Sequence, residues 1–332
     1  MLEVGILGAG FMSSTHAAAY QKLPNVHIAA IADTDKDKVE KLAQQFGCRA
    51  DTQAENIIHD KSIALLDVSL PTPLHAKYAI LGMEAGKHVV VEKPMALSLA
   101  ETDEMLQVYH RTGKFLMVAH VLRFWPEYVK IREVLQNGKL GDPISATSYR
   151  LSNPPQWAVW FLDPKLSGGT VLDLAIHDLD MMNWLFGGLR SVFASGAGEK
   201  NGDWGHVLIQ GNHGRVITSV EASFRMPKDF PFAAGLRVLC ENGMLDYRFQ
   251  AGGASIEQGQ PVNTLMLHEP ERPNQLLAVE AGDAYEREIA YFVKCVQTNH
   301  APTLVPPEEA RMAVQTALAA RRSIESGKPV EL

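Results

Sequence analysis

The sequence predicts two domains: a doubly wound α/β domain with a parallel sheet over residues 1–121, and an α+β domain with a large, mostly antiparallel, open-faced sheet over residues 122–332. Three observations predict this architecture. The chain has 332 residues, which exceeds what one hydrophobic core usually supports. Its first part alternates short apolar runs with helical patterns. Its second part places one strand-like run after another, which indicates antiparallel pairing.

The first domain begins with strands that are expected to be buried on both faces, because their apolar runs lack polar alternation. The runs are LEVGILG (2–8), VHIAAIAD (26–33), ALLDVSL (64–70), HVVVE (88–92) and FLMVA (115–119), and a short extra strand near CRAD (48–51) would complete six. Between them lie helical patterns around Val39–Phe46 and Ala76–Met83, and a segment whose Ser98 and Glu101 have the spacing of a capping box.

The second domain is expected to place its helices on one face of its sheet. The strand-like runs are ISATSYRL (144–151), SVFASGAG (191–198), HVLIQG (206–211), VITSVEASF (216–224), LRVLCE (236–241) and GMLDYRF (243–249), and helices are expected at 127–137, 167–180, 282–298 and 307–326. Asn242-Gly243 predicts a two-residue hairpin turn. Because single chains rarely expose an apolar sheet face, the open face predicts a homodimer or homotetramer.

The composition indicates which classes of binding partner the protein has. The formal net charge is −7 and the 31 Lys and Arg residues form no basic run, so small molecules are favoured and nucleic acid is not. Three scattered cysteines fit neither a disulfide framework nor a cysteine metal site and favour the cytoplasm. No signal peptide and no apolar stretch of about 20 residues is recognised, so no membrane association is expected.

The stretch VGILGAGFMSSTH (4–16) predicts a phosphate-binding turn between a strand and a helix. Gly8, Gly10 and Ser13 form a Gly-x-Gly-x-x-Ser arrangement, in which glycines allow a tight turn and let a pyrophosphate approach the positive end of the helix. Asp33, at the end of the next strand, would accept hydrogen bonds from an adenosine ribose. The alternative is a glycine turn and a surface acid in a fold that binds no nucleotide.

Asp33 also predicts the choice of cofactor. A carboxylate at this place repels a 2′-phosphate, and no Ser-Arg pair follows it, so NAD is favoured over NADP. The predicted cofactor site comprises Gly8, Gly10, Phe11, Met12, Asp33, Leu70, Pro71, Thr72, His75, Glu92 and Lys93.

Two further motifs carry residues suited to catalysis. In HVVVEKPMA, Glu92 and Lys93 lie at the carboxyl end of a strand, where open α/β sheets bind ligands; a solvated strand cap is the alternative. Pro94 biases Lys93 toward an extended conformation, and in SLPTPLHA Thr72 is expected to cap a helix whose first residue is Pro73.

In SGGTVLDLAIHDLD (167–180), Asp173, His177 and Asp180 would share one stripe of an α-helix. His177, one turn or about 5.4 Å from Asp173, can act as a general base whose tautomer that carboxylate fixes. A buried helix with structural ion pairs is the alternative; a metal site lacks a Cys or a second His at helical spacing.

Together these motifs resemble the Gfo/Idh/MocA family of NAD(P)-dependent oxidoreductases, whose members include inositol and sugar dehydrogenases. The resemblance extends over essentially the whole chain. It rests on Gly8 and Gly10 followed by His16, on Glu92-Lys93-Pro94, on HVLRFWP (120–126), on GKLGDP (138–143) and on SGGTVLDLAIHDLDMMNWLFG (167–187).

The resemblance implies a dehydrogenase that oxidises a carbinol carbon of a polyol, cyclitol or sugar, with Lys93, Asp173 and His177 as its catalytic residues and no metal. His177 would take the hydroxyl proton, Asp173 would orient the imidazole or hold a neighbouring hydroxyl, and Lys93 would stabilise the developing alkoxide. The substrate pocket would be walled by Arg123, Asn153, Trp157, Trp160, Asp173 and His177. The other functions open to such a chain are a non-catalytic NAD(P)-binding regulator and an NAD-assisted glycosidase.

Overall fold

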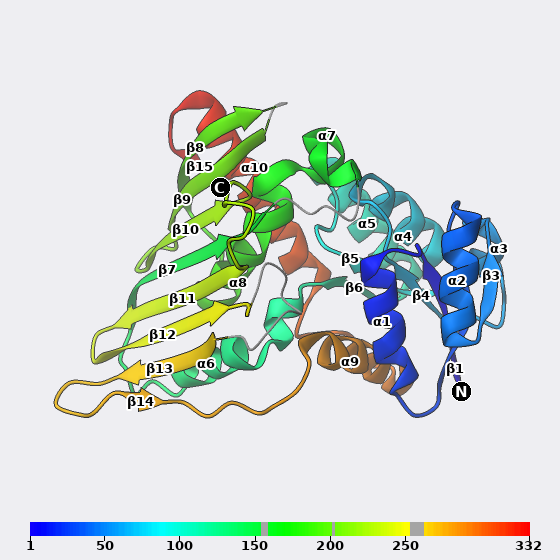
Figure 1. The fold of residues 1–332 in the computed structure, drawn as a ribbon, viewed down its shortest axis with the longest axis horizontal. Coiled ribbons are helices and arrows are strands. Elements are labelled where there is room, and N and C mark those ends of the chain that lie inside the picture. Colours follow the sequence, from blue (N-terminus) through cyan, green and yellow to red (C-terminus); the bar gives the residue numbers. More distant parts are fainter. Residues whose placement is uncertain (154–158, 201–202, 253–261) are drawn as a thin grey trace. The chain divides into compact units, whose positions relative to one another are not determined.

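The chain folds into two compact units, each described here by itself (Figure 1). The computed structural model describes residues 1–153, 159–200, 203–252 and 262–332. The N-terminal unit consists of Met1–Phe124 and Gly282–Arg311, and the C-terminal unit of Trp125–Ala281 and Met312–Leu332. The contacts therefore assign 282–311 to the N-terminal unit, whereas the sequence places this segment in the second domain. The physical reason is the packing of helix α9 (Ala284–Thr298) against α1 (Phe11–Gln21).

The N-terminal unit is built on a six-stranded parallel sheet of order β3-β2-β1-β4-β5-β6. Its strands are β1 (Leu2–Leu7), β2 (Val26–Ala32), β3 (Arg49–Asp51), β4 (Leu65–Val68), β5 (His88–Glu92) and β6 (Leu116–Ala119). The six expected strands are confirmed. The strand order reverses between β1 and β4, and such a switch point opens a crevice at the carboxyl ends of the strands, where ligands bind.

The helices of the N-terminal unit include one, α5 (Leu99–Thr112), that begins at the predicted capping box. They are α1, α2 (Lys36–Phe46), α3 (Ala54–Ile58), the 3₁₀ turn η1 (Thr72–Leu74), α4 (His75–Glu84), α5, the 3₁₀ turn η2 (Val121–Phe124) and α9. At α5, the Ser98 hydroxyl accepts the backbone N–H of Glu101 at 3.3 Å and donates to the Glu101 carboxylate at 2.7 Å, which confirms the cap predicted there.

The C-terminal unit is built on a nine-stranded sheet of order β14-β13-β12-β11-β7-β10-β9-β8-β15. Its strands are β7 (Pro143–Leu151), β8 (Ser191–Lys200), β9 (Asp203–Asn212), β10 (Ile217–Ser223), β11 (Ala233–Cys240), β12 (Gly243–Gln250), β13 (Val262–His268), β14 (Gln275–Leu276) and β15 (Val330–Glu331). Neighbours pair antiparallel except β7 and β10, which are parallel. This confirms the mostly antiparallel sheet.

The hairpin between β11 and β12 differs by one residue from the prediction. Cys240 pairs with Gly243, so the two turn residues are Glu241 and Asn242 and Gly243 begins the strand. Glycine is required there because a Cβ would lie 2.6 Å from the backbone oxygen of His268 on β13.

The helices of the C-terminal unit include α6 and α8, which lie on one face of the sheet (Figure 1). They are α6 (Pro126–Gln136), the 3₁₀ turn η3 (Val159–Leu162), α7 (Pro164–Ser167), the π-helix η4 (Thr170–Ala175), α8 (Ile176–Phe186) and α10 (Pro307–Ser326), which begins in the segment assigned to the N-terminal unit. Strand alternation turns Phe193, Leu208, Ile217 and Leu239 to the opposite face, which we call the outer face; these side chains are 38 to 63% exposed.

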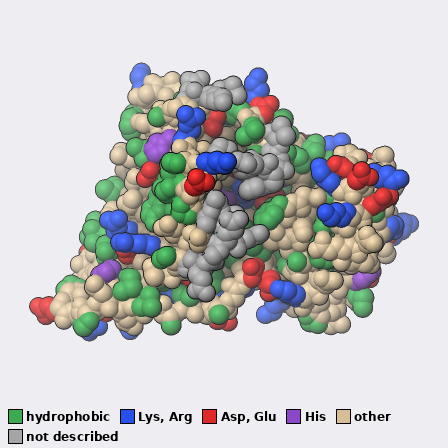
Figure 2. Space-filling model, viewed as in Figure 1, with side chains coloured by type: hydrophobic (Ala, Val, Ile, Leu, Met, Phe, Trp, Pro, Cys, Tyr) green, Lys and Arg blue, Asp and Glu red, His purple; other side chains and the backbone are tan. Residues whose placement is uncertain are grey.

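The surface carries mixed charges. On the face shown in Figure 2, Lys and Arg side chains lie interspersed with Asp and Glu. Among the helices of the described residues, none is both long enough and apolar enough to cross a membrane.

Candidate cofactor and active site

The Gly-x-Gly turn lies between β1 and α1, at the switch point of the parallel sheet. Gly8 has φ +106°, and a Cβ on it would lie 2.3 Å from the backbone oxygen of Ser69, which follows β4. Only glycine tolerates both conditions. Ser13 replaces the third glycine of the motif and is completely buried beneath this turn, with its hydroxyl 3.4 Å from the same oxygen.

The start of α1 has the features that a pyrophosphate needs. Its N-cap is Gly10, which offers no side-chain cap, and the first turn, which contains Phe11 and Met12, has no acidic residue. A Cβ on Gly10 would meet no atom within 4 Å. The N–H groups of the first turn and the positive end of the helix dipole therefore lie beside open space, and the residues present fit the phosphates of a dinucleotide.

Asp33 follows β2 directly and is bound to the same turn. Its Oδ2 accepts the backbone N–H of Ala9 at 2.8 Å, and its Oδ1 accepts that of Asp35 at 2.9 Å. These two bonds hold the half-buried carboxylate at the edge of the sheet beside the glycine turn. A carboxylate oxygen has further lone pairs, so Asp33 can still accept hydrogen bonds from ribose hydroxyls.

The segment after β4 contains four residues of the predicted cofactor site. Pro71 is the N-cap of η1 and Thr72 is its first residue, so the prediction that Thr72 caps a helix beginning at Pro73 is wrong by one position. The Thr72 side chain is 2% exposed. No side-chain hydrogen bond caps η1, because Pro71 at the N-cap has no side-chain acceptor.

His75 connects the segment after β4 with the segment after β5. Its ring nitrogens lie 2.8 Å from the backbone oxygens of Leu70 and Pro94, and the side chain is 1% exposed. Burial is the main cause that lowers the pKa of this imidazole. These contacts support a role in holding the two loops together, and the contact of His75 with a cofactor stays a prediction.

Glu92 and Lys93 end β5, as the sequence indicates. The Glu92 side chain is buried, and its Oε2 accepts the backbone N–H of Lys93 at 3.0 Å. The Lys93–Pro94 peptide is cis, which the sequence did not indicate. The carboxylate thus fixes the backbone of the residue that carries the candidate catalytic amine.

The segment SGGTVLDLAIHDLD begins with two left-handed glycines, and Gly169 is held by a side chain from β9. A Cβ on Gly169 would lie 2.3 Å from Oδ1 of Asp203. The Asp203 carboxylate accepts the backbone N–H of Thr170 at 3.0 Å and its hydroxyl at 2.9 Å. This capping carboxylate was not recognised in the sequence, since it lies 33 residues further along the chain.

The predicted straight α-helix over this segment is wrong in one respect, because residues Thr170–Ala175 form a π-helix before α8 begins. A π-turn is wider than an α-turn and is often found at functional sites. Asp173 lies in the π-helix and is 6% exposed, His177 lies in the first turn of α8 and is half-buried, and Asp180 is 1% exposed. The two carboxylates are therefore buried, and the imidazole between them in sequence is more exposed.

A structural ion pair does lie on this helix, at a residue that the sequence did not single out. Asp178 is completely buried, and its Oδ2 accepts Nε of Arg150 from β7 at 2.6 Å. The pair joins α8 to the sheet of the C-terminal unit.

The remaining predicted substrate residues divide into three groups. The Arg123 guanidinium has no exposed surface and donates to Leu304 O at 3.0 Å and to Glu309, all within the N-terminal unit; these bonds support a structural role. Asn153 donates to the backbone oxygens of Lys228 and Phe230 at 3.3 Å. Trp160 in η3 stacks on Phe161, and Trp157 lies outside the described residues.

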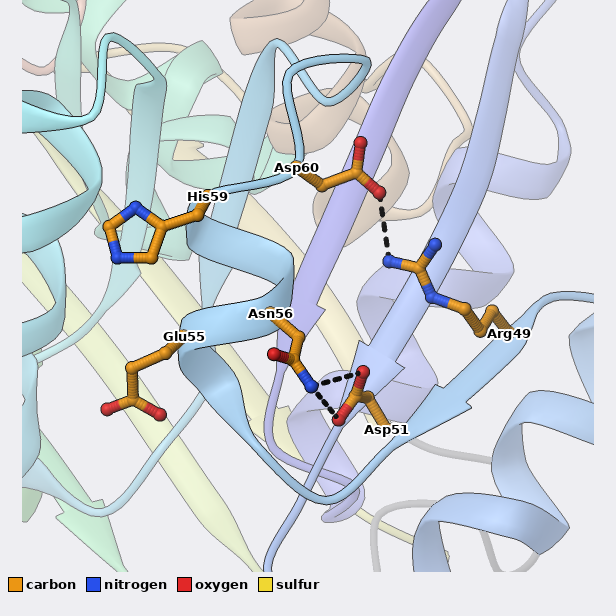
Figure 3. Close-up of a pocket in the computed structure, with 6 residues that line it drawn as sticks. All are labelled: Arg49, Asp51, Glu55, Asn56, His59 and Asp60. Carbon is orange, nitrogen blue, oxygen red and sulfur yellow. Dashed lines mark hydrogen bonds and ion pairs between the residues drawn. The ribbon is translucent and has the colours of Figure 1, made fainter.

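The N-terminal unit also has a surface hollow whose lining residues differ from those of the predicted cofactor site (Figure 3). Six polar side chains line it: Arg49, Asp51, Glu55, Asn56, His59 and Asp60. Four of them already bind one another, since Arg49 donates to Asp60 at 2.9 Å and Asn56 to Asp51 at 3.0 and 3.1 Å. No predicted cofactor residue lines this hollow.

Comparison with known proteins agrees with this fold and with the glycine turn. The model of the oxidoreductase family with an NAD-binding Rossmann fold matches residues 2–120, and the model of the GFO/IDH/MocA C-terminal domain matches residues 128–246. The chain belongs to the Gfo/Idh/MocA family. Members of the Gfo/Idh/MocA family are NAD(P)-dependent dehydrogenases that act on CH–OH groups, and this chain is an NAD(P)-dependent oxidoreductase of that family.

Relatives within the Gfo/Idh/MocA family align over nearly their full lengths. Myo-inositol 2-dehydrogenase of Thermotoga maritima is 26% identical over 100% of this chain and 98% of its own. Scyllo-inositol 2-dehydrogenase (NAD(+)) of Bacillus subtilis is 27% identical over 100% of this chain and 96% of its own. The structure of aldose-aldose oxidoreductase from Caulobacter crescentus superposes with a TM-score of 0.87 at 18% identity, covering 100% of this chain and 99% of the other, and shows the same fold.

Proposed function

We propose that this protein is an NAD-dependent oxidoreductase that transfers hydride between a carbinol carbon of a polyol, cyclitol or sugar and the nicotinamide. The observation that carries the proposal is the glycine turn, where Gly10 leaves open space at the start of α1 and Asp33 is held beside it. The names of the two inositol dehydrogenases support the class of substrate. A carboxylate at Asp33 disfavours a 2′-phosphate, which supports NAD over NADP.

Cofactor binding is assigned to the N-terminal unit. The backbone N–H groups at the start of α1 hold the pyrophosphate, and Asp33 accepts hydrogen bonds from the adenosine ribose. Leu70, Pro71 and Thr72 at the end of β4 border the cofactor. When bound, the nicotinamide supplies the hydride chemistry that protein side chains lack.

Proton transfer and charge stabilisation are assigned to three side chains. His177 accepts the hydroxyl proton of the substrate, and Asp173 orients the imidazole or holds a neighbouring hydroxyl. Lys93 donates a hydrogen bond to the oxygen on which negative charge develops. Asn153 and Trp160 are proposed to border the substrate, as the sequence predicted. The position of Asp173 in a π-helix supports a functional use of this segment.

The substrate class is tested by incubating the protein with NAD and a panel of cyclitols, aldoses and sugar acids and following NADH absorbance at 340 nm. His177→Ala should lower turnover by roughly two to four orders of magnitude with little change in NAD affinity, and Lys93→Ala should be comparably damaging. If His177→Ala is fully active but less stable, the histidine is structural and its assignment as the base is wrong. If NADH never accumulates with any substrate while a glycoside is cleaved, the hydrolytic alternative holds.

We also propose that the outer face of the C-terminal sheet binds a second copy of the chain. Phe193, Leu208 and Ile217 on the neighbouring strands β8, β9 and β10 expose apolar surface on this face, as does Leu239 on β11, which β7 separates from β10. Exposed apolar surface on an open sheet face can serve as an association site, and a two-fold axis would pair this face with itself.

A further inference from the structure

A buried polar chain runs beneath the carboxyl ends of β4 and β5 in the N-terminal unit. At its centre is His16 of α1, whose side chain has no exposed surface. Its Nδ1 lies 2.9 Å from Oδ2 of Asp67, and its Nε2 lies 3.3 Å from Oε1 of Glu92. Neither the cofactor contacts nor the proton transfer proposed above uses this imidazole.

The two carboxylates require a charged imidazole. A neutral ring has one N–H and can donate to only one of them, whereas the doubly protonated ring donates to both. Burial opposes the charge, but the Asp67 and Glu92 carboxylates outweigh it and raise the pKa of His16 well above its ordinary value. The imidazolium therefore joins β4 to β5 through a charge-assisted hydrogen bond from Nδ1 to Asp67 and an ion pair between Nε2 and Glu92, in which Nε2 does not reach hydrogen-bond geometry.

Asp67 is the fixed end of the buried polar chain that runs through His16. Besides His16, its carboxylate accepts the hydroxyl of Tyr20 at 3.0 Å and the hydroxyl of Ser69 at 2.7 Å. Asp67 is completely buried, so these donors leave it little freedom to move. The orientation of the imidazole ring follows from this anchor.

Glu92 is the other end, and it is bound to the backbone of Lys93. While Oε1 faces His16, Oε2 accepts the Lys93 N–H at 3.0 Å. A carboxylate held at both oxygens has one orientation. Contacts thus lead without interruption from Asp67 through the imidazolium and Glu92 to the backbone of Lys93.

A third acid, Glu288 of α9, faces the same cluster without competing for the imidazolium. Its carboxyl is completely buried, and neither oxygen has a hydrogen-bond partner among the described residues. Burial is the main cause that raises the pKa of Glu288; the His16 charge opposes this, and the Glu92 and Asp67 charges add to it. This shift favours the neutral form of Glu288, and the carboxylates in contact with the imidazole are those of Asp67 and Glu92.

We propose that His16 is a positioning residue for Lys93, acting through the ion pair between its Nε2 and the Glu92 carboxylate. The inference rests on the proposed function in so far as Lys93 acts on the substrate. Through this chain the imidazolium fixes the point from which the Lys93 side chain extends. A shift of about 1 Å at a reacting group can cost up to about 10²-fold in rate, so a loose Glu92 would lower turnover without removing any group that touches substrate.

Two substitutions separate the two ring nitrogens. The amide nitrogen of Asn can take the place of Nδ1, so His16→Asn keeps a donor for Asp67 and loses the contact with Glu92. The amide nitrogen of Gln can take the place of Nε2, so His16→Gln keeps a donor for Glu92. Both variants lose the positive charge, and each is therefore the matched control for the other. Melting temperature and NADH affinity are measured on the same preparations to establish folding and cofactor binding.

Turnover is the first readout. With the substrate found by the screen, kcat should fall about tenfold or more in His16→Asn and distinctly less in His16→Gln, while the KM for NAD stays within about twofold in both. Equal kcat values in the two variants, whether both are like wild type or both are equally impaired, would overturn the proposal. A purely structural role predicts equal losses that follow the melting temperature.

The second readout does not depend on activity. The lysines are ¹³C-methylated, and the Lys93 resonance is identified by its absence in Lys93→Arg. In His16→Asn this resonance should shift or broaden relative to wild type, and in His16→Gln it should remain close to wild type. An unchanged Lys93 resonance in His16→Asn refutes the positioning role. If the resonance responds as expected but no substrate is oxidised, the proposed function fails and the link from His16 to Lys93 stands.

Discussion

Alanine substitutions at Gly8 and Gly10 should separate the structural part of the glycine turn from its cofactor-binding part. At Gly8, alanine would adopt φ +106° with its Cβ 2.3 Å from the backbone oxygen of Ser69 and 3.0 Å from Oγ of Ser13. The left-handed backbone costs about 1–2 kcal/mol, and the steric clash of the new methyl group with the backbone oxygen of Ser69 costs about 1–3 kcal/mol. Gly8→Ala should therefore lower the free energy of unfolding by about 2–5 kcal/mol, or the melting temperature by roughly 4–20 °C.

Gly10→Ala should have the opposite profile. Gly10 has φ −90°, which any residue adopts, and its Cβ would meet nothing within 4 Å. The free energy of unfolding should stay within about 0.5 kcal/mol of wild type. The methyl group would nevertheless occupy the space at the start of α1 that is proposed for the pyrophosphate, so NADH affinity should fall about tenfold or more, a loss of about 1.4 kcal/mol or more.

Both variants are measured by thermal denaturation without cofactor and by NADH fluorescence titration. Wild-type NADH affinity in a folded Gly10→Ala protein would refute the placement of the pyrophosphate at this turn. An unchanged melting temperature in Gly8→Ala would refute the steric role of the Ser69 contact. The two results are independent, because thermal denaturation is measured on the protein without cofactor, whereas the titration measures the binding of NADH.

Three further predictions follow from single contacts. Asp33→Ser should narrow the preference for NAD over NADP, which is expected to be at least about tenfold in kcat/KM; a wild-type protein that prefers NADP would contradict the role of Asp33. Burial raises the pKa of Glu288 in the folded protein above its unfolded value, so its neutral form stabilises the fold below the unfolded pKa, and this contribution is lost as pH rises toward the folded pKa. Glu288→Gln should therefore have a higher free energy of unfolding than wild type at pH 8, by about 1.4 kcal/mol for each tenfold rise in the proton affinity of the carboxyl on folding. This difference should vanish near pH 4. If the free energies of unfolding of the two proteins run parallel from about pH 4 to pH 8, the pKa of Glu288 is not raised by folding. Wild type should sediment as a dimer or tetramer of the 36.5 kDa chain, and Leu208→Asp on the outer face should dissociate it; a wild-type monomer at micromolar concentration would refute the proposed self-association.

The parallel sheet could be predicted strand by strand, because five of its six strands lie in short apolar runs between helical patterns; β3 is a short polar segment that completes the sheet. Val89, Val90 and Val91 of β5, for example, have no exposed surface, as an apolar run in a two-sided layer requires. The partner of a helix was harder to predict. The pattern Ile289, Phe292, Val293 identifies α9 and its apolar face, but amphipathic periodicity does not say which surface covers that face, and here it is α1.

Residues that act through distant partners could not be found in the sequence. Asp203 caps the π-helix across 33 residues, and the Arg150–Asp178 pair spans 28. His16 was visible only as part of a motif, because its two carboxylates come from different strands. In each case the residue is recognised by a contact between two helices or strands, and the spacing of residues along the sequence does not reveal such a contact.

The helix that contains Asp173 and His177 shows how the structural and functional interpretations can be told apart. The sequence placed Asp173, His177 and Asp180 on one stripe by assuming 3.6 residues per turn, but the π-helix at Thr170–Ala175 widens the turn that carries Asp173. This helix does contain a structural ion pair with a buried carboxylate. It is formed by Asp178 and Arg150, and not by His177. Attachment of α8 to the sheet therefore does not depend on His177. The half-buried His177 stays the proposed base, and the His177→Ala experiment tests directly whether its imidazole serves proton transfer or packing.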